Sequence, residues 1–508
     1  MSTSNSFTNQ IINPFLYSLL HFRERNAFCI NEIFYEYGKF GDCINRILTS
    51  VKLVDAERVY FGLVVNDDLE TYASIFALWL EGKAYVPLHP HQPIDRSTEI
   101  LSQMAINTVL DSSIASDFSA YTLIETSKLP DNGTQIEGFS ETSDSGIAYI
   151  LFTSGSTGKP KGVEISRGNL GAFTDSFWTT GINLTENDRC LQCFDLTFDV
   201  SIQSFLTPLL RGACVYTIPH NQIKYSYVYG LLTDHNLTFG AMAPSMLRFL
   251  RPYFDEIEAP DMKACILTAE ASPADLAMEW YQCIPNADIY DLYGPTEATI
   301  YCTCYKVEKS GVNKTLNGML SIGNPLKNVT AIIVDEDEKL LPRGEKGELC
   351  VSGGHISPGY WNDPEKTQRA FFVKEIEGVL HRFYRTGDVC YYDADGLLML
   401  YGRIDSQVKI QGYRVELGEI EFHARYFLNG NNVVVLPFIN DSGNTELALF
   451  IEMVSADTAA LMDYLKQKLP FYMIPTKIIF EPQFLLNSNS KVDKLKLKEK
   501  LSSLCQNT

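Results

Sequence analysis

The chain has 508 residues, more than one domain usually holds, and 45% of them are apolar, enough to bury a large core. Its net charge is −20, from 42 basic and 62 acidic residues. This charge excludes nucleic acid as an expected partner, because phosphates demand a basic face, and it argues against an anionic membrane surface. The longest apolar stretch, residues 72–80, is too short to span a bilayer, and residues 1–9 lack a signal pattern. We expect a soluble cytoplasmic protein.

Strand-like and helix-like segments alternate along the chain up to residue 404. A buried strand over 59–65 comes first, then a helix that Asp67 or Asp68 caps and that runs to Leu80. The same rhythm predicts a helix over 200–210 and strands over 84–86, 148–152, 214–218, 264–267 and 288–292. This alternation predicts an α/β fold class, with a large multi-layer N-terminal domain, 1–404, whose sheets are mostly parallel. Residues 405–508, with a helix over 459–469 and a strand over 477–480, form a small α+β domain.

The 12 cysteines are scattered and show no disulfide-like framework. Cys190 and Cys193 form one CxxC, and Cys302 and Cys304 lie close together. A metal or redox site is one interpretation, and cysteines buried on apolar strands are the other. We favour burial, because no second CxxC or histidine pair has the spacing of a zinc site.

A loop rich in glycine and hydroxyl groups follows the predicted strand over 148–152. Residues 153–162 (TSGSTGKPKG) hold three glycines, four hydroxyl side chains and two lysines. Glycines let backbone N–H groups converge on an anion, and the hydroxyls and lysines add donors and charge. It is not a Walker loop, since two residues separate Gly155 from Gly158 where four are needed. We interpret the segment as a phosphate-binding loop; a flexible turn is the alternative.

This loop resembles the signature loop of the adenylate-forming superfamily, which includes acyl-CoA synthetases, luciferases and the adenylation domains of nonribosomal peptide synthetases. Further segments similar to the family's motifs follow in the family's order: 80–88, 291–297, 347–350 with 359–361, 384–388, 402–405, 408–416 and 489–494. The resemblance covers nearly the whole chain. It implies a ligase that uses ATP and Mg²⁺ and forms an acyl-AMP intermediate.

The resemblance also assigns ATP-binding residues: Thr153, Ser154, Gly155, Ser156, Thr157, Gly158 and Lys159 in the loop, then Asp291, Tyr293, Gly294, Thr296, Asp388 and Arg403. Tyr293 would offer a flat face to adenine, and Asp388 and Arg403 would reach the ribose. Glu297 is the implied magnesium ligand. The alternatives are a helix-capping Glu297, a turn aspartate at 388 beside Gly387, and a solvated loop arginine at 403.

The resemblance makes Lys491 the catalytic lysine of adenylation. The chain departs from the family pattern on either side of it, with Ser490 in place of a glycine and Lys494 in place of an arginine. Asp405 matches the family hinge. The small domain would rotate there after adenylation and bring in Lys409 and Gly412 to line a tunnel for the thiol.

The substrate prediction depends on Asp199. In amino-acid-activating relatives the matching aspartate binds the substrate ammonium. The alternative is that Asp199 is only the N-cap of a helix. The other positions that the resemblance assigns to the pocket are Val200, Gln203, Ala241, Leu267, Ala269, Leu292, Ile300 and Tyr301. This set has one amide and no charge, so a small apolar side chain fits, because a charged one would be buried without a partner.

We therefore interpret the chain as a stand-alone amino-acid adenylation enzyme. The Asp-Val-Gln beginning and Ala269 resemble prolyl-activating pockets, and L-proline is the leading substrate. A D-alanine–carrier protein ligase and an acyl- or aryl-CoA ligase are the alternatives. With no carrier segment expected after Thr508, the acceptor would be the phosphopantetheine thiol of a separate carrier protein.

Overall fold

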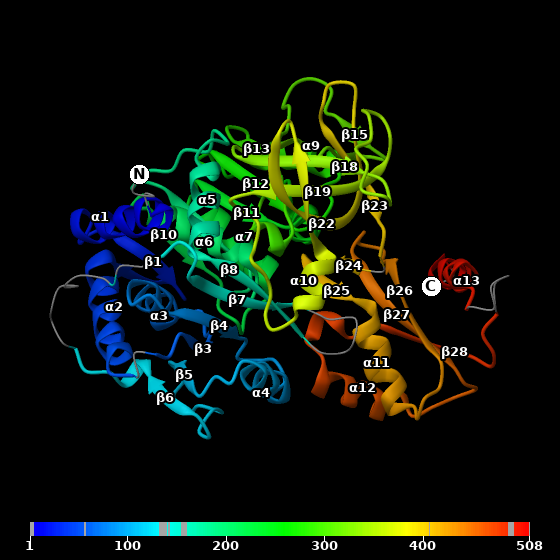
Figure 1. Cartoon of the computed structure of the whole chain (residues 1–508), viewed down its shortest axis with the longest axis horizontal. Coiled ribbons are helices and arrows are strands. Elements are labelled where there is room, and N and C mark those ends of the chain that lie inside the picture. Colours follow the sequence, from blue (N-terminus) through cyan, green and yellow to red (C-terminus); the bar gives the residue numbers. More distant parts are fainter. Residues whose placement is uncertain are drawn as a thin grey trace. The chain divides into compact units, whose positions relative to one another are not determined.

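The computed structural model describes residues 5–54, 57–131, 140, 143–153, 160–405, 407–485 and 492–506. Two compact units divide it. The larger comprises 1–90, 101–152 and 162–404, and the smaller comprises 91–100, 153–161 and 405–508. The predicted α/β class is confirmed: parallel sheets with helices make up the larger unit, and an α+β arrangement follows from residue 405 (Figure 1).

The larger unit contains a nine-stranded sheet whose central strands are parallel. Its spatial order is β17 (Asn324–Pro325), β14 (Thr303–Lys306), β13 (Asp288–Tyr293), β12 (Ala264–Thr268), β11 (Phe239–Met242), β9 (Arg189–Gln192), β10 (Cys214–Thr217), β1 (Asn26–Ile30) and β2 (Ile33–Glu36).

A second sheet has seven strands, and parallel pairing joins β7, β4, β3, β5 and β6. The order is β20 (Gly359–Tyr360), β8 (Lys161–Ser166), β7 (Ile147–Thr153), β4 (Ala84–Leu88), β3 (Tyr60–Val64), β5 (Thr108–Asp111) and β6 (Thr122–Glu125). A third, antiparallel sheet contains β18 (Val329–Val334), β19 (Gly347–Gly353), β22 (Val379–Tyr392), β21 (Phe371–Ile376) and β23 (Leu398–Arg403), and a small hairpin pairs β15 (Thr315–Leu316) with β16 (Met319–Leu320).

Helices cover the sheets and fill the core between them. The α-helices up to residue 404 are α1 (Asn13–His21), α2 (Tyr37–Lys52), α3 (Leu69–Leu80), α4 (Ile94–Gln103), α5 (Arg167–Phe177), α6 (Asp199–Leu209), α7 (Lys224–Asp234), α8 (Pro244–Leu250), α9 (Ala274–Cys283) and α10 (Pro364–Ala370). Short π or 3₁₀ turns occupy Thr8–Ile12, Thr126–Lys128, Arg251–Tyr253 and Thr296–Ala298.

Helix α3 shows why this core is stable. Asp68 is its N-cap and accepts from the Thr71 amide at 2.8 Å, which satisfies one of the free donors of the first turn. Apart from Glu70 the helix is buried throughout, as expected for a helix that is apolar on all sides. Tyr72 packs against Phe205 of α6 with ring centroids 5.3 Å apart, so helices from both large sheets share one core.

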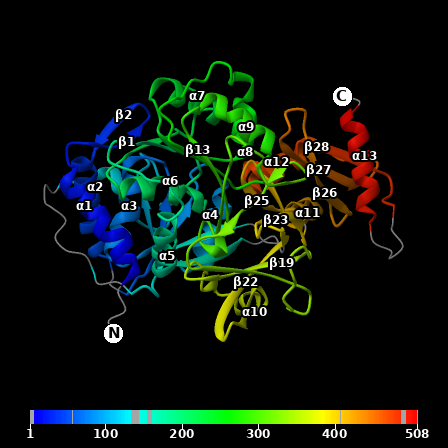
Figure 2. The same cartoon turned by 90° about the horizontal axis from the view of Figure 1, so that it is seen from above.

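The smaller unit is built on two sheets. One is the hairpin of β24 (Gln407–Ile410) and β25 (Tyr413–Glu416); the other has the order β26 (Val433–Ile439), β27 (Thr445–Glu452) and β28 (Lys477–Glu481). Helices α11 (Leu417–Phe427) and α12 (Thr458–Lys468) lie on one face of the three-stranded sheet, and α13 (Lys494–Gln506) lies on the other (Figure 2). The 3₁₀ turn Phe471–Met473 follows α12. Leu497 and Leu501 of α13 pack on Val434 and Phe450 of the sheet.

Candidate functional site: a carboxylate-rich group at the strand ends

The predicted site residues of the larger unit gather where parallel strands end. Asp199 follows β9, Ala269 follows β12, and Gly294 to Glu297 follow β13. Carboxyl ends of neighbouring parallel strands meet at one edge of a sheet, where α/β proteins bind their ligands. The fold thus brings together residues that are up to about a hundred positions apart in the sequence.

Asp388 is the centre of one group of predicted ATP-binding residues. It lies on β22, where the Arg403 guanidinium donates to its Oδ1 at 2.7 Å and the Tyr293 hydroxyl donates to its Oδ2. The alternatives of a turn aspartate and a solvated loop arginine are therefore wrong, because both residues lie on paired strands and form a half-buried ion pair. A carboxylate held by two donors keeps lone pairs for a further pair of hydroxyls, as a ribose diol would supply.

Gly294 and Asp291 are fixed by close packing. A Cβ at Gly294 would lie 2.4 Å from the Ile300 carbonyl oxygen, so only glycine fits where the chain folds back on itself. Asp291 is buried on β13 and accepts from the Ser272 hydroxyl at 3.1 Å. Both residues hold the backbone of the segment that leads to Thr296 and Glu297.

Glu297 is fully buried, with no exposed surface. It lies in the 3₁₀ turn Thr296–Ala298, whose N-cap is Pro295, so the interpretation of Glu297 as a helix cap is wrong. The Tyr360 hydroxyl donates to its Oε1 at 2.8 Å. A buried carboxylate with hard oxygen donors fits Mg²⁺, which is commonly held by one or two carboxylates together with substrate phosphates.

Asp199 is a buried carboxylate with one oxygen unsatisfied. It is the first residue of α6, whose N-cap is Phe198, so the alternative in which Asp199 is the cap is wrong. Its Oδ2 has no hydrogen-bond partner among the described residues. Burial raises its pKa to about 6; hydrogen bonding from Thr296 opposes this rise, and the charge of Glu297 adds to it. An orphaned carboxylate oxygen of this kind is suited to a cationic ligand.

Gln203 and Tyr301, two further predicted substrate residues, take part in a buried hydrogen-bond network. The Gln203 amide donates to the Thr207 hydroxyl at 3.1 Å, and its carbonyl oxygen accepts from the Tyr301 hydroxyl at 3.4 Å. The polar groups of Gln203 are therefore engaged within the protein. The apolar members of the set are buried except Ala269, which is half-buried: Val200, Ala241, Leu267, Ala269, Leu292 and Ile300.

Two predicted substrate residues, Ile300 and Tyr301, lie in a strained turn. Thr299 and Ile300 have φ of +50° and +72°, which a β-branched residue rarely adopts. His355 holds this turn: its carbonyl accepts from the Thr299 hydroxyl at 2.6 Å, and its Nδ1 lies 3.0 Å from the Tyr301 carbonyl, to which it donates. Nothing in the sequence pointed to His355 beyond its place between two family motifs.

Tyr149 is a second residue that sequence reasoning missed. It lies buried on β7, and its hydroxyl has no hydrogen-bond partner in the described part of the chain. Burial raises its pKa well above 10, and the charge of Asp199 adds to this rise. Only the fold relates these two side chains, because fifty positions separate them in the sequence.

His355 predicts acid sensitivity. Burial lowers its pKa from 6.5 to about 4, so the unfolded chain binds a proton that the folded chain rejects, and stability falls as the pH drops from 6.5 towards 4. For this residue alone the loss is about 2 kcal/mol at pH 5. Urea unfolding at pH 7 and pH 5 should show this difference between the wild type and His355→Asn, which cannot take up the proton. Parallel losses in the two proteins would contradict the assignment.

The smaller unit carries the other predicted residues. Thr153 ends β7, and its buried Oγ1 has no hydrogen-bond partner among the described residues. The Asp405 carboxylate accepts from the Gln407 amide at 3.1 Å, and Lys409 lies on β24. Gly412, with φ of +84°, completes a two-residue turn between β24 and β25. Ser154 to Lys159, Ser490 and Lys491 lie outside the described residues.

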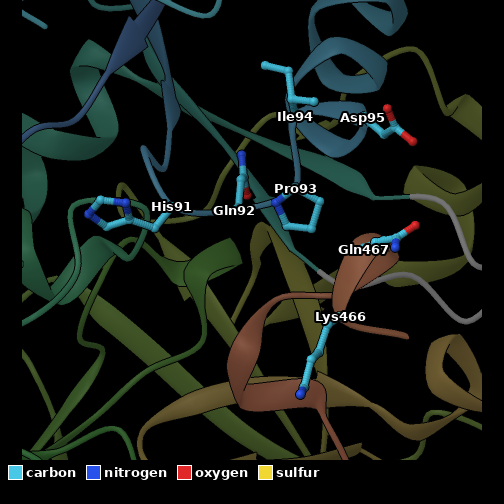
Figure 3. A pocket seen from close by; sticks show the side chains of 7 residues that line it. All are labelled: His91, Gln92, Pro93, Ile94, Asp95, Lys466 and Gln467. Carbon is cyan, nitrogen blue, oxygen red and sulfur yellow. The ribbon is translucent and has the colours of Figure 1, made fainter. Parts of the chain in front are cut away.

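The smaller unit also has a pocket that no prediction named (Figure 3). Its volume is about 430 Å³, and it is open to solvent. Its lining comes from the segment before and into α4 and from the end of α12: His91, Gln92, Pro93, Ile94, Asp95, Lys466 and Gln467. None of these is a predicted site residue, and we assign it no role in the chemistry.

The cysteines from Cys29 to Cys390 are free thiols, and all of them but the half-buried Cys304 are buried. Burial raises the pKa of Cys193 to about 12, which keeps it protonated and unreactive. Within the described part of the chain no group of three or more histidine, cysteine or acidic side chains could hold a metal ion. None of its described helices combines the length and apolar character needed to cross a membrane.

Comparison with known proteins agrees with this geometry. Residues 42–361 match the family of AMP-binding enzymes. The D-alanine–D-alanyl carrier protein ligase of Bacillus licheniformis is 31% identical over 447 residues, which are 84% of this chain and 87% of that protein. Tyrocidine synthase 1 of Brevibacillus parabrevis is 31% identical over 447 residues, 86% of this chain. The chain spans between 9% and 40% of the length of three such peptide synthases.

The solved structures give the same result. The adenylation domain AlmE of Vibrio cholerae, in complex with glycyl-adenosine-5'-phosphate, is 25% identical with a TM-score of 0.84, and the match covers 97% of both chains. The fold also matches holo-PA1221, which contains adenylation and carrier domains, with a TM-score of 0.85 over 96% of this chain and 84% of that one. The chain belongs to the AMP-binding enzyme family.

Proposed function

We propose that this ligase activates a small apolar amino acid as its aminoacyl-AMP and transfers it to the phosphopantetheine thiol of a separate carrier protein. The observation that carries the proposal is Asp199, a buried carboxylate beside the Thr296–Glu297 segment with one oxygen that no described residue satisfies. An α-amino acid brings an ammonium that would satisfy this oxygen, whereas a fatty or aryl acid would leave it buried without a partner.

The chemistry follows from the arrangement of charges. The substrate carboxylate attacks the α-phosphorus of ATP, the bond to the β-phosphate bridging oxygen breaks, and pyrophosphate leaves. We assign Lys491 to stabilise the added charge, Thr296 to the α-phosphate and residues 153–159 to the phosphates. We place adenine against Tyr293 and ribose at Asp388 and Arg403. When bound, a magnesium ion held by Glu297 would neutralise phosphate oxygens.

The substrate side chain should be small and apolar. The amide of Gln203 already donates to Thr207 and accepts from Tyr301, so part of its hydrogen-bonding capacity is used within the protein. Asp199 is the only acid among the nine assigned positions, and it is reserved for the ammonium. L-proline is our leading substrate, from the resemblance of Asp199, Val200, Gln203 and Ala269 to prolyl-activating pockets. The relatives named as D-alanine–carrier ligases and the glycyl-adenylate complex of AlmE make D-alanine and glycine the competing substrates.

We further propose a functional division into 1–404 and a mobile domain, 405–508, with Asp405 as hinge. After adenylation the thiol of the carrier arm would attack the acyl carbon and AMP would leave. Lys409 and Gly412 would then line the path of the carrier arm and its thiol. We place the enzyme in the cytoplasm, because its cysteines from Cys29 to Cys390 are free thiols and ATP is available there.

Amino-acid-dependent exchange of pyrophosphate into ATP tests the proposal. The panel contains the proteinogenic amino acids, D-alanine, cyclopentanecarboxylate and benzoate. Exchange with proline, alanine of either hand or glycine, and none with the two acids that lack an amine, is the expected result. Exchange with benzoate alone would replace this proposal with an aryl-CoA ligase.

Gly412 supplies a test of the thiol path. Gly412→Asn should keep adenylation and slow transfer to the thiol, because asparagine tolerates the φ of +84° while its side chain would narrow the path. The matched control is Gly430→Asn in the same unit, at φ +91° with open space around it. Single-turnover loading of a carrier protein measures transfer, and pyrophosphate exchange measures adenylation. Equal loading by both variants would contradict the assigned path.

A further inference from the structure

The Tyr360 hydroxyl contacts the Glu297 carboxylate directly. It donates to Oε1 at 2.8 Å, and both side chains are buried, Glu297 completely and Tyr360 to 7% exposure. A hydrogen bond from a hydroxyl to an ionised carboxylate is stronger than one between neutral groups, and burial strengthens it further. This bond helps to orient the carboxylate from a residue 63 positions away.

Tyr360 is itself held from three sides. Its strand β20 pairs with β8, with Tyr360 opposite Val163, and the next residue donates its amide to the Gly162 carbonyl at 2.8 Å. The Tyr360 amide donates to the Thr367 hydroxyl of α10 at 3.0 Å. Gly162 is the last residue of the predicted phosphate loop and Val163 follows it, so the strand that leaves this loop also pairs with the strand of Tyr360.

We propose that Tyr360 is a positioning residue for divalent-ion binding, which fixes the Glu297 carboxylate relative to the strand that leaves the phosphate loop. The proposal rests on the proposed role of Glu297 as magnesium ligand. Loss of the hydroxyl would remove one donor that orients this buried carboxylate, and so loosen its position as an ion ligand.

If the Tyr360 hydroxyl had only a structural role, its removal would lower stability and leave the affinity for the ion unchanged. The same result is expected for a buried tyrosine outside the site. Tyr37 is the matched case: it is fully buried, its hydroxyl donates to the Ala213 carbonyl at 2.7 Å, and the prediction assigns it no part in the site. Tyr360→Phe and Tyr37→Phe each remove one oxygen atom from a buried ring.

The test measures Mn²⁺ binding by electron paramagnetic resonance, with the full chain saturated by the non-hydrolysable analogue α,β-methylene-ATP. Calorimetry without metal measures analogue binding separately. Tyr360→Phe should weaken Mn²⁺ binding by about 10- to 100-fold, with little change in metal-free analogue binding. Tyr37→Phe should bind Mn²⁺ as the wild type does. Thermal unfolding of each variant confirms that it is folded.

Glu297→Gln and the double variant complete a mutant cycle. Glu297→Gln should weaken Mn²⁺ binding at least as much as Tyr360→Phe, and adding Tyr360→Phe to it should cause little further loss, because both act through one carboxylate. Wild-type Mn²⁺ binding by Tyr360→Phe, with weak binding by Glu297→Gln, would overturn the proposal for Tyr360 alone. Wild-type binding by Glu297→Gln would overturn the assignment of Glu297 as the ligand. Fully additive losses would also contradict positioning through Glu297.

Discussion

Asp199→Asn should lower kcat/KM for the amino acid by about 100-fold or more, because breaking a buried charge pair typically costs about 3–5 kcal/mol. The substrate ammonium would then enter a buried site with no anionic partner. ATP affinity should stay near that of the wild type, since the assigned nucleotide contacts are untouched. Pyrophosphate exchange at varied amino-acid concentration, and calorimetry with ATP, measure the two effects.

The pH dependence of the wild type gives an independent check on Asp199. Burial raises its pKa to about 6, so below this pH the free enzyme holds a neutral carboxyl group that cannot pair with an ammonium. The apparent KM for the amino acid should rise about tenfold for each pH unit below 6. Asp199→Asn should lack this rise.

The raised pKa of Asp199 also predicts that Asp199→Asn is more stable than the wild type, although it is less active. A carboxyl group whose folded pKa exceeds its unfolded value stabilises the fold at low pH, and this contribution disappears as the pH rises through 6. Asp199→Asn should therefore stabilise the ligand-free enzyme by up to about 3 kcal/mol at pH 7.5 and by little at pH 4. Normal proline activation by a stabilised variant would show that Asp199 does not hold the substrate.

Lys491→Ala should reduce pyrophosphate exchange by about 1,000-fold or more while ATP still binds, since it removes a charge that acts mainly in the transition state. The assignment comes from the resemblance of residues 489–494 to the family's catalytic segment, and Lys491 lies outside the described residues. Its loss should leave thiol transfer from a chemically prepared aminoacyl-AMP intact, because the lysine acts in the first half-reaction.

Lys494 is the matched control for Lys491. It begins α13, three positions further on, and its ammonium lies 3.9 Å from the Glu421 carboxylate, half-exposed to solvent. Lys494→Ala removes a surface ion pair, which contributes at most about 1 kcal/mol, so exchange should stay near the wild-type rate. Near wild-type exchange by Lys491→Ala, or equal loss in both variants, would contradict the assignment.

Most of the fold could be predicted from the sequence, because local patterns determine it. Asp67 or Asp68 before a long apolar run indicated the start of α3, whose cap is Asp68, and the run to Leu80 indicated its end. The predicted helix over 459–469 is α12, Thr458–Lys468, shifted by one residue. Such elements depend on periodicity and capping, which are encoded within a few residues.

The residues of the candidate site that belong to sequence motifs could be predicted. The motif residues Tyr293, Asp388 and Arg403 do meet in one group, although nothing in their spacing could reveal which oxygen each contacts. His355 and Tyr360 were missed because their roles come from tertiary contacts. Each acts on a residue more than fifty positions away, and only the folded chain shows such pairs.

The fate of the carboxylate oxygen tests the central claim of amino-acid adenylation most directly. The amino acid that the exchange panel selects is labelled with ¹⁸O in both carboxylate oxygens and incubated with ATP, Mg²⁺, the enzyme and an acceptor thiol. Attack of the carboxylate on the α-phosphorus, followed by thiol transfer, predicts AMP that carries one ¹⁸O atom, which mass spectrometry detects, together with unlabelled pyrophosphate. Unlabelled AMP, or ADP and labelled phosphate, would contradict it.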